Sequence, residues 1–124
     1  MNHHNIILSL RDVSVAYDGY AALEGVDLDI YDRRRKLMVN SFNAMGMTCF
    51  EPEGAFYIYP NIGKFGLTSE AFCEKLLYEH KCAIVPGIAF GAAGEGFARI
   101  SYAYSVKHIN QALERMEAFI KPLK

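Results

Sequence analysis

A strand pattern followed directly by a helix pattern, over residues 97–120, most constrains how this chain can fold. Side chains in residues 97–103 alternate between two faces, as they do along an extended strand. Residues 106–120 then place apolar side chains at every third or fourth position, which is the spacing of one helix face, and Ser105 can cap that helix. We therefore expect this helix to pack on one face of a sheet. The apolar helix positions are Val106, Ile109, Leu113, Met116 and Ile120.

The preceding segments show a mixture of the same two patterns. A helix is expected from Tyr31 to a stop at Gly46, and a second helix is expected after a cap at Thr68. Residues 54–60 and 82–85 have the composition of strands. The resulting order of helix, strand, helix, strand, strand, helix predicts an α+β fold in which helices cover a small β-sheet. The apolar helix positions are Met38, Phe42 and Met45 in the first helix and Phe72, Cys73, Leu76 and Leu77 in the second.

The first thirty residues have the pattern of a β-hairpin. Alternating apolar residues precede and follow the turn signal Asp18-Gly19, and the second run continues to Ile30. The alternation slips near Arg11-Asp12, where we expect a β-bulge. The sequence thus divides into an N-terminal hairpin segment, residues 1–30, and a domain, residues 31–124.

The composition excludes some classes of partner. At 124 residues, with 52% hydrophobic residues, the chain suits one globular core. The formal net charge is −1, which gives no reason to expect nucleic acid or a membrane as partner. The basic run Arg33-Arg34-Arg35-Lys36 can bind phosphate, but at helical spacing it is more typical of a solvated helix face.

Cysteine and histidine usage indicates neither a disulfide framework nor a metal site. Cys49, Cys73 and Cys82 are odd in number and include no CxxC pair, which favours buried, reduced thiols in a cytosolic protein. His3 and His4 have no supporting cluster of carboxylates or cysteines, so we expect no metal. The sequence shows no membrane span and no apolar signal core, and we expect a cytoplasmic location.

Arg99 is the charged residue whose setting suggests a function. The strand alternation places it opposite Ile100, on the face that points away from the predicted core. A guanidinium there can hold a carboxylate through two parallel hydrogen bonds, or it can be an ordinary surface arginine. The preceding loop, residues 86–96, contains four glycines and allows close backbone approach. It lacks the Lys-Ser/Thr of a P-loop and leads into a strand, so it is a weak phosphate motif.

Four segments share an order and spacing with a known family: Tyr31 to Arg35, Pro52 to Pro60, Val85 to Gly91, and Arg99 to Ala103. Together they resemble the C-terminal small domain of class I/II aminotransferases, which are PLP-dependent enzymes of fold type I. The resemblance extends over residues 31–121 and implies that Arg99 binds the substrate α-carboxylate. It also implies that Gly54, Ala55 and Phe56 lie near the substrate. It assigns no catalytic residue to this chain.

The resemblance also implies that no cofactor is held by this chain. In the family, PLP is bound by a Schiff-base lysine, an aspartate on the pyridine nitrogen, a tyrosine and a phosphate cup, all in the large domain. None of the seven lysines here matches the Schiff-base motif, and residues 1–30 do not resemble that domain. Without such a lysine, PLP has no productive attachment.

A second resemblance covers residues 6–30. Ile7 to Tyr17 and Ala22 to Ile30 resemble the opening hairpin of an ABC-transporter ATPase domain, a family in which the aromatic residue at the Tyr17 position stacks on adenine. Walker A, the signature motif and Walker B do not follow, so we expect Tyr17 to pack on a neighbouring strand. The two resemblances together suggest a fusion, whether natural or engineered.

Three functions fit these observations. We favour an isolated small domain without catalytic activity of its own. The alternatives are a subunit that completes a separate PLP-binding chain and contributes Arg99, and a module that binds a small carboxylate or a protein partner. In the family, the large domain covers the surface around this arginine. Its exposure here would leave an apolar patch, so we expect a homo-oligomer, as a dimer.

Overall fold

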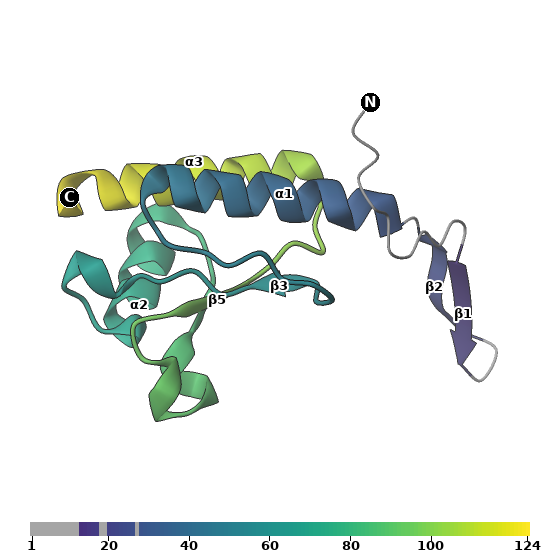
Figure 1. Ribbon diagram of the computed structural model, residues 1–124, viewed down its shortest axis with the longest axis horizontal. Coiled ribbons are helices and arrows are strands. Elements are labelled where there is room, and N and C mark those ends of the chain that lie inside the picture. Colours follow the sequence, from purple (N-terminus) through teal and green to yellow (C-terminus); the bar gives the residue numbers. More distant parts are fainter. Residues whose placement is uncertain (1–12, 18–19, 27) are drawn as a thin grey trace. The chain divides into compact units, whose positions relative to one another are not determined.

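The computed structural model describes residues 13–17, 20–26 and 28–124, with side chains from residue 31 onward (Figure 1). Backbone contacts divide the chain into two compact units, Met1–Arg33 and Arg34–Lys124. The larger unit contains the small sheet and the helices that cover it.

The N-terminal unit contains a β-hairpin. β1 (Val13–Tyr17) and β2 (Tyr20–Val26) pair in antiparallel fashion, and their register shifts between Val13 and Ala16. The hairpin is therefore confirmed over these residues. The bulge predicted near Arg11-Asp12 lies outside the described residues, as do His3 and His4.

The strand predicted to reach Ile30 ends earlier. Leu28 to Ile30 belong to α1 (Leu28–Met45), so the prediction is wrong for these residues. A few alternating positions are a weak signal. Extending an existing helix is favourable, because each added residue gains a hydrogen bond once the helix has nucleated. The helix accordingly begins before Tyr31, where the sequence pattern placed its start.

α1 packs its apolar side into the core of the larger unit. Met38, Phe42 and Met45 are buried, as their spacing predicts. After Met45, Gly46 adopts a φ of 83°, and the Met47 N–H donates to the Phe42 carbonyl at 2.8 Å. Glycine has no Cβ to oppose this left-handed conformation, which explains why the helix stops here.

Arg35 departs from the solvated basic face predicted for residues 33–36. Its side chain is 21% exposed, donates to the Pro52 carbonyl at 2.9 Å and pairs with the Glu51 carboxylate at 3.2 Å. The guanidinium thus ties α1 to the segment that precedes Gly54. The prediction of a solvated face is wrong at this position, because a helical spacing alone does not reveal which loop returns to the helix.

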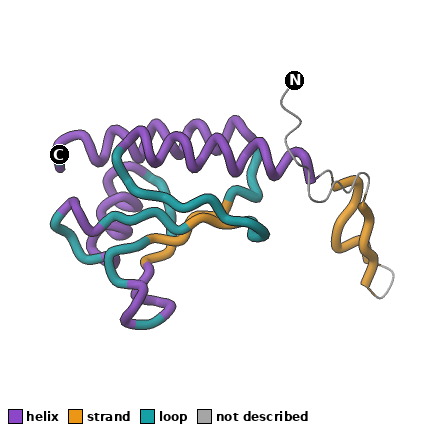
Figure 2. Tube along the Cα trace, in the orientation of Figure 1, coloured by secondary structure: helices purple, strands orange, loops and turns teal. Residues whose placement is uncertain are grey.

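The larger unit contains a three-stranded antiparallel sheet in the order β3-β5-β4. Figure 2 draws its strands in orange. β3 is Tyr57–Ile58, β4 is Val85–Pro86 and β5 is Ala98–Ser101. In this sheet Ile58 of β3 pairs with Ile100 of β5, and Val85 of β4 pairs with Arg99 of β5.

The strands are shorter than the sequence patterns predict. Residues 54–60 form a strand at β3 alone, and residues 82–85 contribute one residue to β4. Pro60 and Pro86 have no N–H to donate, which interrupts the ladder of hydrogen bonds at each of them. Pairing resumes beyond Pro60 only as a single bridge between Asn61 and Phe97. Strand-like composition therefore marks these segments correctly but overstates how much of each is paired.

α2 (Ser69–His80) and α3 (Val106–Ile120) begin at the predicted caps. The Thr68 hydroxyl oxygen accepts from the Ala71 N–H at 3.2 Å. The Ser105 hydroxyl oxygen accepts a backbone N–H of the first turn of α3 at 3.3 Å. Both contacts satisfy N–H groups that have no partner within the helix.

The buried faces of these helices match the sequence prediction at most positions. Leu77 and Val106 are exceptions, with 42% and 46% of each residue exposed. Leu77 is rotated away from the buried row, and Val106 lies at the very start of its helix. Phe119, which the periodicity argument omitted, is buried against Phe72 with ring centroids 4.9 Å apart. The confirmed positions are Phe72, Cys73, Leu76, Ile109, Leu113, Met116 and Ile120.

α1 and α3 run along the same side of the sheet (Figures 1 and 2). Together with α2 they confirm the predicted α+β fold of a small sheet covered by helices. Within the described residues, no helix combines the length and apolar content that a membrane crossing needs. Short 3₁₀ helices occupy Gly63–Phe65, Gly87–Phe90, Ala92–Gly94 and Lys121–Leu123.

Candidate carboxylate-binding site

The sheet has a buried face and an outward face, and the candidate site lies on the outward one. Alternation along β5 and the residue that follows it places Ala98, Ile100 and Tyr102 in the core, each at most 8% exposed. Arg99 and Ser101 lie on the opposite face and are accessible to solvent. The sequence prediction that Arg99 points away from the core is therefore confirmed.

Arg99 is partly buried, and its guanidinium lies against two aromatic rings. Its Cζ atom is 4.4 Å from the ring centroid of Phe90 and 5.5 Å from that of Tyr57. Among residues 31–124, whose side chains are described, the Arg99 side chain makes no hydrogen bond and no ion pair. Aromatic rings attract the positive charge without supplying a strong hydrogen-bond acceptor. The N–H donors are therefore free to bind an anion.

The glycine-rich loop before β5 folds back on itself beside this arginine. A Cβ on Gly87 would lie 1.9 Å from the Gly94 carbonyl oxygen, and one on Gly94 would lie 2.1 Å from the Gly87 carbonyl oxygen. The Tyr59 hydroxyl donates to the same Gly87 carbonyl at 3.3 Å. This crossing confirms the predicted close backbone approach, which no residue larger than glycine permits.

Glu95 joins the same loop to the start of α2. Its two carboxylate oxygens accept hydrogen bonds from the Ser69 backbone N–H at 2.7 Å and from the Ser69 hydroxyl at 2.8 Å. These two bonds hold the pKa of Glu95 below its ordinary value. The Ile88 N–H donates to the Ser69 hydroxyl oxygen at 3.3 Å. The loop that carries Phe90 is therefore fastened to the helix at two points.

The segment predicted to lie near the substrate is only partly joined to Arg99. Phe56 is 60% exposed, and its ring meets Tyr57 edge-on with centroids 5.6 Å apart. The Ala55 carbonyl accepts a hydrogen bond from the Tyr102 hydroxyl. Gly54 faces open space. Phe56 thus borders a ring that contacts the guanidinium, while the substrate-binding roles of Gly54, Ala55 and Phe56 stay predictions.

Tyr57 lies in a different place from the one that sequence alone suggests, and Tyr59 is half-buried. Aromatic residues on strands are most often core residues, which is the interpretation favoured for Tyr57 and Tyr59 by sequence alone. That interpretation is wrong for Tyr57, which is 40% exposed and contacts Arg99. Both tyrosines flank buried Ile58, so period-two alternation could have assigned them to the outward face. Phe90 has no such signal, because it lies in a loop.

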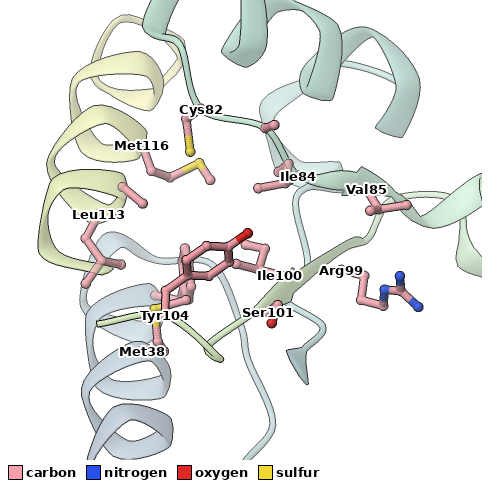
Figure 3. A pocket seen from close by; sticks show the side chains of 13 residues that line it. Met38, Cys82, Ile84, Val85, Arg99, Ile100, Ser101, Tyr104, Leu113 and Met116 are labelled. Atoms are coloured by element: carbon pink, nitrogen blue, oxygen red, sulfur yellow. The ribbon is translucent and has the colours of Figure 1, made fainter. Parts of the chain in front are cut away.

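A separate cavity of about 270 Å³ opens on the helix side of the sheet (Figure 3). Its lining includes Val85 and Arg99, which pair across β4 and β5. Arg99 borders this cavity, but its guanidinium points away from the cavity centre (Figure 3). The cavity is therefore distinct from the free N–H donors. Its lining is Met38, Phe42, Cys82, Ala83, Ile84, Val85, Arg99, Ile100, Ser101, Tyr104, Ala112, Leu113 and Met116.

The three cysteines are buried and free, as predicted. Burial raises the pKa of each thiol, in the case of Cys73 to about 12. Because the thiolate is the reactive form, these cysteines are poor nucleophiles. Among the residues that the structure describes, no group of histidine, cysteine and acidic side chains is arranged to hold a metal ion.

The residues around Arg99 do not fit PLP, the cofactor that the family resemblance implies. PLP needs an amine for covalent attachment, and the rings of Phe90 and Tyr57, which lie against the guanidinium, offer none. The cavity lining contains no lysine either. Lys81 donates to the Tyr78 carbonyl at 2.6 Å, and Lys64 lies over the Phe65 ring. The rings beside Arg99 and the lining of the cavity therefore offer no amine to which the cofactor could attach.

A sequence model of the family described as "Aminotransferase class I and II" matches residues 26–116. The match contains the sheet, the glycine-rich loop and Arg99. The chain therefore belongs to the class I and II aminotransferase family. The match begins four residues before residue 30, so it overlaps the end of the segment that resembles an ABC-type hairpin. The ABC resemblance of residues 6–30 stays a prediction.

Individual relatives agree with the family match. An aspartate aminotransferase of Pyrococcus abyssi is 51% identical over 94 residues, which are 76% of this chain and 24% of that protein. An aromatic-amino-acid aminotransferase of Thermococcus litoralis is 47% identical over 94 residues, with the same coverage. The crystal structure of an aromatic aminotransferase from Pyrococcus horikoshii is 51% identical and superposes with a TM-score of 0.74, covering 76% of this chain and 25% of that one. The chain spans about a quarter of the length of these relatives.

Proposed function

We propose that residues 31–124 form the carboxylate-binding part of an aminotransferase site, with residues 1–30 as a separate segment. In this proposal, Arg99 holds the α-carboxylate of an amino acid or a 2-oxo acid through its N–H donors. The observation that carries it is a partly buried guanidinium with no hydrogen-bond acceptor among the described residues. A planar fork of donors matches the two oxygens of a carboxylate. The aminotransferase relatives support the choice of substrate class.

We further propose that this chain does not transfer amino groups by itself. Amino-group transfer needs PLP as an electron sink and an amine to hold it. The rings of Phe90 and Tyr57 beside Arg99 and the lining of the neighbouring cavity offer no such amine. The chain thus supplies substrate binding, and a PLP-binding chain or domain supplies the chemistry. A stoichiometric, borohydride-reducible absorbance of lysine-bound PLP in the purified chain would contradict this.

The carboxylate proposal is tested by titrating the chain with 3-phenylpropionate and with its uncharged amide, followed by NMR. We expect the acid to bind weakly and the amide not to bind. Arg99→Ala should weaken binding of the acid at least about tenfold, because charge-assisted hydrogen bonds are lost. Lys107→Ala, at an exposed position on α3, is the control for loss of one positive charge. Binding that survives Arg99→Ala would show that the carboxylate goes elsewhere.

A second candidate function is partner binding through the same outward face. Phe56, Tyr57, Ile88 and Phe90 are between 40% and 60% exposed, and large apolar residues gathered on one surface commonly mark an interface. We propose that a second copy of the chain covers this face when no PLP-binding partner is present. Light scattering at high concentration should then report a dimer. A stable monomer, or a dimer that Phe90→Ser leaves intact, would rule out this interface.

A further inference from the structure

We propose that Phe90 and Tyr57 are positioning residues that hold the guanidinium of Arg99 with its N–H donors free. The inference rests on the proposed function, because it explains how that arginine is kept ready for a carboxylate. The two rings come from separate elements, since Tyr57 lies in β3 and Phe90 lies in the 3₁₀ helix Gly87–Phe90. Their meeting at one guanidinium therefore depends on the fold and not on neighbouring positions in the sequence.

The contact with Phe90 is the tighter of the two. The Cζ atom is 4.4 Å from the Phe90 centroid and 5.5 Å from the Tyr57 centroid, both within the range of a cation–π interaction. Arginine has a long side chain that loses rotational freedom when it is fixed. Rings that fix it in the free protein remove part of that cost from ligand binding, which raises affinity.

The structure also holds Phe90 in place. Its ring meets Tyr59 with centroids 6.3 Å apart, and Tyr59 stacks on Phe97 at 5.5 Å and 15°. Gly91, directly after Phe90, adopts a φ of 111°, a conformation that favours glycine. The nearby Ile88 N–H is bonded to α2 through Ser69. The ring that contacts Arg99 is therefore part of a supported row of aromatic residues.

Aromatic rings differ from carboxylates as partners for this arginine. A carboxylate would neutralise the charge and occupy the N–H donors that a substrate needs. The rings attract the cation and leave both the charge and the donors available. A lysine at this position would not reproduce the arrangement, because an ammonium is a compact point charge without a planar fork.

The test compares ring-removing and ring-keeping substitutions. Phe90→Leu and Tyr57→Leu remove a ring, whereas Phe90→Tyr and Tyr57→Phe keep it. Phe50→Leu, at a residue that is 81% exposed, is the control for loss of a phenylalanine elsewhere. One readout is the NMR shift of the Arg99 Nε–H group, identified by its loss in Arg99→Lys. The other is the affinity for 3-phenylpropionate.

We expect the Arg99 Nε–H resonance to be displaced upfield by the rings in the unmodified chain. Phe90→Leu should move it toward the value of a free arginine and lower the affinity about two- to fivefold. Tyr57→Leu should have a smaller effect of the same sign, and both ring-keeping variants and Phe50→Leu should behave as the unmodified chain. A melting curve of each variant establishes that it is folded.

The outcomes separate this inference from the proposed function. If the resonance stays unchanged in Phe90→Leu and Tyr57→Leu, the rings do not position Arg99 and the inference is wrong. The inference is also wrong if the resonance moves but the affinity for 3-phenylpropionate stays the same. If the unmodified chain binds no carboxylate while the resonance still moves, the rings do position the side chain and the proposed function fails instead.

Discussion

The two faces of the three-stranded sheet are built from alternate residues of the same strands, yet one face is buried in the core and the other is exposed to solvent. On the core face, Ile58 and Ile100 are 1% and 8% exposed and pair across β3 and β5. On the outward face, Tyr57 of β3 stays 40% exposed and contacts Arg99. Phe90, from the loop before β5, stays 50% exposed and contacts the same guanidinium. Burial of the first set stabilises the fold. The second set leaves apolar surface in water and keeps a positive charge without a counterion among the described residues.

Because of this difference, neighbouring residues of one strand should contribute either to the stability of the fold or to ligand binding. A period of two places each strand residue on one face or the other. A change on the core face should therefore alter the free energy of unfolding, and a change on the outward face should alter ligand binding. The loop that crosses at Gly87 and Gly94 is where the two faces depend on each other, because it both closes the fold and carries Phe90.

Gly87→Ala tests that dependence and should have the largest effect. The added methyl group would lie 1.9 Å from the Gly94 carbonyl oxygen and 2.7 Å from that of Phe97, and backbone atoms cannot move aside as a flexible side chain can. We expect the free energy of unfolding to fall by at least about 3 kcal/mol, measured by urea denaturation.

Gly54→Ala is the matched control, because its Cβ would meet no atom within 4 Å. It should change the free energy of unfolding by less than about 0.5 kcal/mol. Equal stability of the two variants would mean that the loop does not cross at Gly87. The proposed dependence of the two faces on each other would then be wrong.

The comparison of the faces is sharpened by placing threonine at two adjacent positions. Ile58→Thr removes a buried apolar side chain and introduces a hydroxyl into the core, so it should cost about 2–4 kcal/mol of unfolding free energy. Tyr57→Thr keeps a residue suited to a strand on the outward face and should cost less than about 1 kcal/mol. Both values follow from urea denaturation. A larger loss for Tyr57→Thr than for Ile58→Thr would reverse the assignment of the faces.

Much of the core face can be predicted from the sequence, and the outward face only in part. Period-two alternation around Ile100 and three- and four-residue spacing in α3 identify the buried side chains directly. The same alternation places Arg99 outside the core. It does not place Phe90 beside Arg99, because the contact depends on how the glycine-rich loop folds back. Contacts between a loop and a strand have no period that a sequence could display.

The smallest expected effect concerns the carboxylate that fastens this loop. Hydrogen bonds from Ser69 lower the pKa of Glu95 from its ordinary value of 4.5. A lowered pKa in the folded state means that the ionised carboxylate stabilises the fold at neutral pH. That stabilisation declines as the pH falls from 4.5 through the lowered value. The midpoint of thermal unfolding should therefore differ most between the unmodified chain and Glu95→Gln near neutral pH.

The difference between these midpoints should shrink on acidification, in melting curves recorded between about pH 3 and about pH 7. Ser69→Ala removes the hydroxyl donor and leaves the backbone N–H. In a chain that carries Ser69→Ala, adding Glu95→Gln should therefore lower the unfolding midpoint by less than it does in the unmodified chain, but should still lower it. A pH-independent difference would mean that Glu95 acts through packing. The loop that carries Phe90 would then be held without the negative charge of Glu95. Arg99 would be left as the charged group that distinguishes the outward face from the apolar core face.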